Sequence, residues 1–210
     1  RPHQGRPRQV GQVQGQDDHV YGHLCEQRDG VRSGADVSDD RQTFTFKLRP
    51  EAKFSDGTPV TSADVAFSVE VLRDKGRPNF KNSYSKLSKV ETPDARTVVF
   101  HQVLGDRELP LIIGVMPILS KTFWQGRIFD ATTLDPIVGS GPYVIAEVKP
   151  GESIIYRKNT NYWGKDLSLG KGLWNFAEVR FDYYRDANAA FGAFKTGQAD
   201  VRTESDPTRW

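Results

Sequence analysis

Apolar and polar residues alternate over residues 43–49, a pattern typical of a half-buried strand that ends at Pro50. Farther along, Thr61 is a good N-cap residue, and Asp64 lies three positions after it, close to a capping box. Apolar residues then recur at i, i+4 and i+7 until Gly76; they are Val65, Val69 and Leu72. This spacing predicts a helix between Thr61 and Gly76.

Similar patterns predict further elements downstream. They are strands over 97–101 and 178–184, a hairpin with arms 143–148 and 153–158, and a helix capped by Asp186 that stops at Gly197. The residues expected in the core are Phe46, Val65, Val69, Leu72, Phe100, Phe181, Phe191 and Phe194. This strand-rich mixture, without regular βαβ alternation, predicts the α/β fold class.

The first part of the chain has a different character. Residues 1–42 contain Arg but no Lys, are rich in Gln and Gly, and show no apolar period. We therefore expect residues 1–42 to be poorly ordered. Two alternatives are less favoured. Arg1 to Arg8 would form a basic arm for nucleic acid, and His19, His23 and Cys25 would supply three zinc ligands, although a structural site needs a fourth.

The composition narrows the classes of protein. The 210 residues are 37% hydrophobic and 27% charged, which argues against disorder throughout. A formal charge of +2 gives no reason to expect nucleic acid or an anionic membrane as a partner. Cys25 is the single cysteine, which excludes an internal disulfide and a cysteine-based zinc cluster. The apolar stretch 109–119 contains Pro and Gly and is too short to span a membrane.

No motif in the sequence indicates a particular catalytic activity. Residues 139–141 (GSG) lack the glycine that a nucleophile elbow needs two positions before Ser140, so a turn into the next strand is favoured. Adjacent acids such as Asp39-Asp40 are typical of a solvated surface, because paired catalytic carboxylates come from separate elements. The aromatic residues Tyr162, Trp163 and Trp174 could stack on a ligand, but packing is the favoured interpretation.

Several motifs, in order, nevertheless resemble one family. Residues 45–65 (TFKLRPEAKFSDGTPVTSADV) resemble the strand–turn–helix motif of family 5 extracellular solute-binding proteins, the peptide-binding subunits of ABC importers. Residues 138–143 (VGSGPY) and 161–164 (NYWG) resemble a second motif of that family. Residues 72–78 (LRDKGRP) and 181–187 (FDYYRDA) are similar to its subgroup of long oligopeptide and microcin-type binders.

The resemblance covers residues 43–210 and weakens upstream. Residues 21–26 (YGHLCE) resemble a short helix of the family, whereas the match fails before Tyr21 and over residues 27–39. One hypothesis is that residues 1–42 are a non-native N-terminus, produced by a reading-frame error that is restored around Asp39-Asp40. The nucleotide sequence would decide this.

The resemblance implies an incomplete, mixed-sheet first lobe of a type II periplasmic binding protein, with an inserted subdomain over about 65–138. Members close two lobes on a peptide or similar small solute and deliver it to an ABC permease in the membrane. The implied protein is a periplasmic monomer without cofactor, metal or catalytic residue, and this chain carries no signal peptide and lacks the second lobe. Tyr84, Met116 and Ser140 are the candidate ligand-binding residues, chosen from their loop positions beside the family's cleft.

Two other functions remain open from the sequence. One is a hydrolase that acts on peptides or glycosides with an acid pair near the aromatic residues. The other is a non-functional fragment that folds only in part. Turnover of a peptide or glycoside would favour the hydrolase, and stoichiometric binding by the full-length protein would favour the solute-binding protein.

Overall fold

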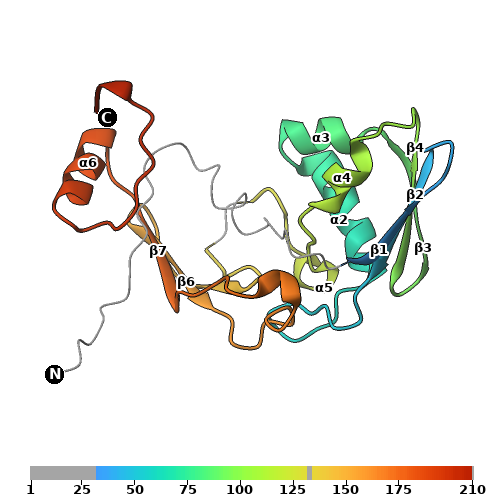
Figure 1. The fold of residues 1–210 in the computed structure, drawn as a ribbon, viewed down its shortest axis with the longest axis horizontal. Coiled ribbons are helices and arrows are strands. Elements are labelled where there is room, and N and C mark those ends of the chain that lie inside the picture. Colours follow the sequence, from blue (N-terminus) through green and yellow to red (C-terminus); the bar gives the residue numbers. More distant parts are fainter. Residues whose placement is uncertain (1–31, 132–133, 210) are drawn as a thin grey trace.

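Two antiparallel sheets organise the chain in the computed structural model, which describes residues 32–131 and 134–209. The larger sheet has the order β1-β2-β4-β3, and its strands are β1 (Arg32–Val37), β2 (Thr43–Leu48), β3 (Leu87–Asp94) and β4 (Thr97–Gln102). The smaller sheet has the order β5-β6-β7, from β5 (Tyr143–Lys149), β6 (Ser153–Lys158) and β7 (Glu178–Asp182). Figure 1 shows the two sheets on opposite sides of the molecule.

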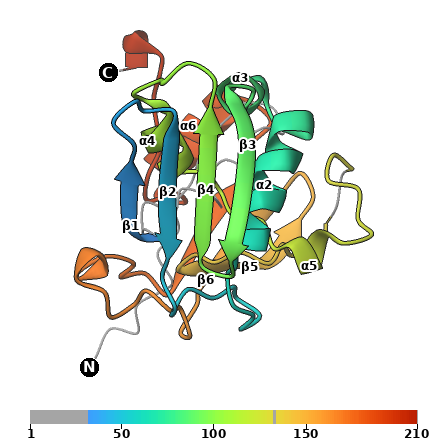
Figure 2. The same cartoon turned by 90° about the vertical axis from the view of Figure 1, so that its right-hand side faces the viewer.

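Helices cover one face of the larger sheet. They are α2 (Ser62–Lys75), α3 (Pro78–Tyr84) and α4 (Leu109–Gly114), and α5 (Lys121–Trp124) packs beside α2. Figure 2 shows the opposite face of this sheet, which no helix of the described chain covers. The helix α6 (Ala187–Lys195) and two short 3-10 turns, Ser168–Gly170 and Pro207–Arg209, belong to the C-terminal part. The expected α/β fold is thus confirmed, and no described helix has the length and apolar character needed to cross a membrane.

The predicted helix α2 begins and ends where its sequence indicates. Asp64 Oδ2 accepts the Thr61 backbone N–H at 2.9 Å and the Thr61 hydroxyl at 2.6 Å. The other carboxylate oxygen of Asp64 accepts the backbone N–H of Lys121 at 2.8 Å. At the far end, the Gly76 N–H donates to the Leu72 carbonyl at 3.0 Å. Asp64 therefore joins the start of α2 to the start of α5.

The main core lies between the larger sheet and its helices. Phe44 and Phe100 are opposite each other on β2 and β4, and their rings stack with centroids 5.0 Å apart. Phe46 meets both rings edge-on. The predicted burial of five residues in this core is confirmed; they are Phe46, Val65, Val69, Leu72 and Phe100. The core extends along the chain from Phe44 to Trp124.

The smaller sheet has a small core of its own, formed by Ile145, Ile154 and Tyr156. Phe181 meets the Tyr156 ring edge-on at 5.4 Å. Phe181 is only half-buried, so the prediction that it is fully buried is wrong. A thin three-stranded sheet places its side chains near solvent, because the described residues provide little to cover them.

The helix α6 forms as predicted but turns a different face inward. Its cap is confirmed, since the Asp186 carboxylate accepts the Ala189 N–H at 2.8 Å, and Gly197 follows with a φ of 73°. The buried residues are Ala190 and Ala193, whereas Phe194 is 41% exposed, which corrects its predicted burial.

Phe191 of the same helix is half-buried, which is also less than predicted. Its ring is covered by cations: the guanidinium carbons of Arg202 and Arg209 lie 5.1 and 5.7 Å from the ring centroid. Contacts of this kind are favourable for an aromatic ring near solvent, where the cations keep part of their hydration. Phe191 was expected to pack against apolar core residues, but Arg202 and Arg209 of the C-terminal segment cover its ring instead.

The end of the segment that was expected to be poorly ordered forms a strand. Arg32–Val37 pairs antiparallel with β2, with a register shift near Gly34. Residues 38–42 form a hydrogen-bonded turn between β1 and β2, in which the Arg41 N–H donates to the Ser38 carbonyl at 2.8 Å. The remainder of that expectation falls on residues 1–31, outside the described residues, as do His19, His23 and Cys25. The proposed subdomain boundary at about residue 65 stays a prediction.

Candidate functional site

The sheet of β1 to β4 and the helices α2 to α5 are here called the larger body, and the sheet of β5 to β7 with its loops the smaller body. Ser140 lies in the segment that connects the larger body to β5. Its side chain is 2% exposed. The Trp163 indole N–H donates to the Ser140 carbonyl oxygen and to its hydroxyl oxygen, at 3.0 Å each. The neighbouring Gly139 carbonyl accepts the Ser55 backbone N–H at 2.7 Å. As predicted, the GSG segment leads into a strand, and Ser55 and Trp163 hold two adjacent residues of it, Gly139 and Ser140.

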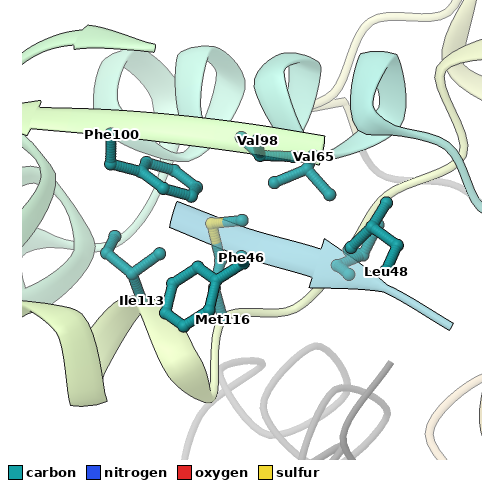
Figure 3. A pocket seen from close by; sticks show the side chains of 8 residues that line it. Phe46, Leu48, Val65, Val98, Phe100, Ile113 and Met116 are labelled. Carbon is teal, nitrogen blue, oxygen red and sulfur yellow. The ribbon is translucent and has the colours of Figure 1, made fainter. Parts of the chain in front are cut away.

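Met116 follows α4 and belongs to the main core. It is 4% exposed and lines a void of about 10 Å³. Figure 3 shows Met116 among Phe46, Phe100 and Ile113. A void of this size has room for about one water molecule, and its apolar lining offers that water no hydrogen bond. In this structure Met116 therefore fills core space.

Tyr84 is the last residue of α3, and its side chain is fully buried. Its ring lies 5.6 Å from the ring of Phe80, between centroids, within the core cluster. Neither Tyr84 nor Ser140 lines the void next to Met116. The structure thus does not bring the three candidate residues into one cleft, and their contact with a ligand stays a prediction.

A second, more open cavity of about 260 Å³ lies beside α5. Its lining residues are Phe123, Trp124, Arg127, Ile128 and Ala131. The guanidinium of Arg127 lies over the Phe123 ring at 4.4 Å and donates to Asp135 at 3.0 Å. Cavities that enclose a drug-sized ligand measure about 300–1,000 Å³. This groove is somewhat smaller and contains none of the three candidate residues.

The aromatic residues after β6 pack against each other, in agreement with the favoured interpretation. Tyr162 is buried, with its ring 5.5 Å from Trp163 and 5.2 Å from Trp174. A side chain at Gly164 or Gly170 would collide with the Tyr162 or Trp174 ring, because its Cβ would lie 2.7 or 2.3 Å from the nearest ring atom. The bond from Trp163 to Ser140 was not predicted from the sequence, in which the glycines close to the aromatic residues are a signal of tight packing.

Titratable groups in the described residues mainly support local structure. Hydrogen bonding from the Ala189 backbone N–H holds the pKa of the Asp186 carboxyl below its ordinary value. Burial raises the pKa of the Tyr143 hydroxyl, which donates to the Phe176 carbonyl at 2.8 Å. Among residues 32–131 and 134–209, no group of three or more His, Cys, Asp or Glu side chains is placed to hold a metal ion.

Known proteins that are similar to this chain include binding proteins. The sequence profile described as bacterial extracellular solute-binding proteins, family 5 middle, matches residues 21–210. A Brucella melitensis protein, provisionally named as a binding protein, is 42% identical over 83% of this chain and 29% of its own length. The probable peptide-binding protein YejA of Agrobacterium fabrum is 38% identical over 90% of this chain and 31% of its own length.

A solved structure shares the fold. It is that of the PBP AgaA from A. tumefaciens R10 in complex with agropinic acid, which is 32% identical and superimposes with a TM-score of 0.70. The match covers 82% of this chain and 34% of AgaA. The chain therefore corresponds to part of the type II periplasmic binding protein fold. It spans about a third of the length of these relatives.

Proposed function

The chain belongs to family 5 of the bacterial extracellular solute-binding proteins, and from this membership we propose that it is part of the substrate-binding component of an ABC importer. In this role the whole protein captures a peptide or similar small solute between two lobes and delivers it to a membrane permease. The observation that carries the proposal is the match of the family profile to residues 21–210. The proposed location is the periplasm, and the proposed state is a monomer.

The named ligands of relatives support the choice of solute. YejA is named as a probable peptide-binding protein, and AgaA was solved with agropinic acid. A lobe that closes on an extended peptide can bond to its backbone whatever its side chains are, which suits a carrier of varied peptides. Ligand binding then shifts the equilibrium between open and closed forms by its preference for the closed one.

We place this chain on one side of the ligand. It spans about a third of the relatives' length, and the cavities described beside Met116 and α5, of about 10 and 260 Å³, are smaller than a typical ligand site. In the proposed whole protein, Tyr84, Met116 and Ser140 belong to the first lobe, and a second lobe supplies the opposite wall. Water is excluded only when both walls meet.

Calorimetry on a full-length protein that contains this chain tests the proposal. Titration with a peptide pool is expected to give saturable heat with one peptide bound per protein. Mass spectrometry of the recovered peptides should show them intact. Cleaved peptides would favour the hydrolase instead, and a full-length protein that binds no peptide or small solute would overturn the proposal.

A further inference from the structure

The larger body and the smaller sheet meet at Trp163. This residue lies in the loop between β6 and β7, so the chain assigns it to the smaller sheet. Its side chain nevertheless packs against the core that the larger sheet and its helices form. A side chain of one body is therefore inserted at the edge of the other.

The connecting segment is held from both bodies at the same place. From the larger body, the Ser55 N–H donates to the Gly139 carbonyl at 2.7 Å. From the smaller one, the Trp163 indole N–H donates to both oxygens of Ser140, and the Asn159 N–H donates to the Pro142 carbonyl at 2.8 Å. Proline also fixes φ at the end of this segment. Rotation of the backbone here would break bonds on both sides.

The loop that carries Trp163 is itself tightly packed. Trp174 has a φ of 52°, a left-handed conformation that is unfavourable for a residue with a side chain. It persists because its ring meets Tyr162 edge-on at 80° and lies directly against Gly170. Such a conformation is kept only where the surroundings determine it. The loop that positions the Trp163 indole is thus held in place by its own packing.

Hinges are segments whose few residues absorb large changes in φ and ψ. The 139–142 segment is unlike a hinge, because its backbone is hydrogen-bonded to both bodies. The Trp163 indole N–H also donates to two oxygens of Ser140, and the Trp163 ring packs against the main core. We infer that Trp163 is a positioning residue that holds the larger body rigidly against the smaller sheet, so that the two bodies move as one unit. This deepens the proposed function, on which it rests in one respect: the unit would form one complete wall of the ligand site.

Distances between spin labels test the inference without a ligand. Lys81→Cys on α3 and Glu152→Cys in the β5–β6 turn place one label on each body, and Cys25→Ser removes the native thiol. Trp163→Phe keeps an aromatic ring but removes the N–H. Tyr143→Phe is the matched control, since it removes a donor to the Phe176 carbonyl within the smaller body.

The parent chain and the Tyr143→Phe control should give one narrow distance distribution by double electron–electron resonance, and Trp163→Phe should give a broad one. Should Trp163→Phe fail to fold, Ser140→Ala decides, because it removes only the hydroxyl acceptor and should broaden the distribution to a lesser degree. A broad distance distribution in the parent chain would overturn the inference. So would a narrow distribution in whichever of the Trp163→Phe and Ser140→Ala variants fold. Either result leaves the ligand proposal to be judged by calorimetry.

Discussion

The carboxylate of Asp64 accepts the backbone N–H of Lys121 at 2.8 Å, across 57 residues of sequence. Its other oxygen accepts from Thr61, so one buried side chain serves the N-termini of two helices. Asp64→Ala leaves these donors without a partner, and leaving a buried donor unsatisfied costs about 1–3 kcal/mol. Urea denaturation should therefore show this loss in the free energy of unfolding.

Asp74→Ala is the matched control for this prediction. Asp74 lies on the same helix with its side chain 55% exposed, and it forms an ion pair with the adjacent Arg73. Surface changes of this kind usually stay within about 0.5 kcal/mol. Equal stability of the two variants would show that the bonds made by Asp64 do not stabilise the fold.

The stacked rings of Phe44 and Phe100 predict a large effect of core truncation. Phe100→Ala removes a side chain with no exposed surface and should cost about 3–5 kcal/mol. The same substitution at Phe194, which is 41% exposed, should cost less than about 1 kcal/mol. Thermal and urea denaturation of the two variants measure the difference. A Phe194 variant as unstable as the Phe100 variant would contradict the assigned orientation of α6.

The contrast between these two residues shows what sequence patterns can predict. Along α2, one apolar stripe and one cap specify both the helix and its inner face, because polar residues fill the rest. In α6, alanines and phenylalanines share the apolar surface, so periodicity predicts the helix but does not choose the face. That choice depends on Arg202 and Arg209, which reach the Phe191 ring from a later segment.

Local sequence patterns could not predict the strand β1 or the contact between Ser140 and Trp163, because both depend on residues distant in the sequence. Arg32–Val37 contains Gly and Asp and has no alternation, so its strand conformation comes from pairing with β2. The bond from Trp163 to Ser140 joins residues 23 positions apart. Local patterns predict a turn at Ser140 and packing at Trp163, but the contact between the two residues depends on the folded chain.

The cap of α6 predicts a pH dependence at the acid end. Because the backbone N–H of Ala189 stabilises the ionised Asp186, the folded-state pKa is depressed. The cap's contribution to stability is therefore present above the unfolded-state pKa and is lost as the pH falls through the folded-state pKa. Carboxyl-carbon NMR should place the Asp186 midpoint below that of an unstructured aspartate.

Two variants separate the cap from a general acid effect. Asp186→Asn keeps a side-chain oxygen that can accept the Ala189 N–H, so α6 should retain most of its protection from hydrogen exchange near neutral pH. Asp186→Ala should lose protection in the first turn of α6. A midpoint at or above the ordinary value, or equal protection in both variants, would argue against the cap as the cause.

The central claim is that this chain supplies one wall of a peptide site and that a second lobe supplies the other. Calorimetric titration of the 210-residue chain and of a full-length protein containing it, with the same peptides, tests the claim most directly. In the proposed site the second lobe pairs with the two terminal charges of the peptide, and the loss of these two charge-assisted bonds should weaken binding by about a hundredfold or more. The account predicts saturable binding by the full-length protein and binding weaker by at least that factor in the 210-residue chain. Equal affinity in the two proteins would contradict it.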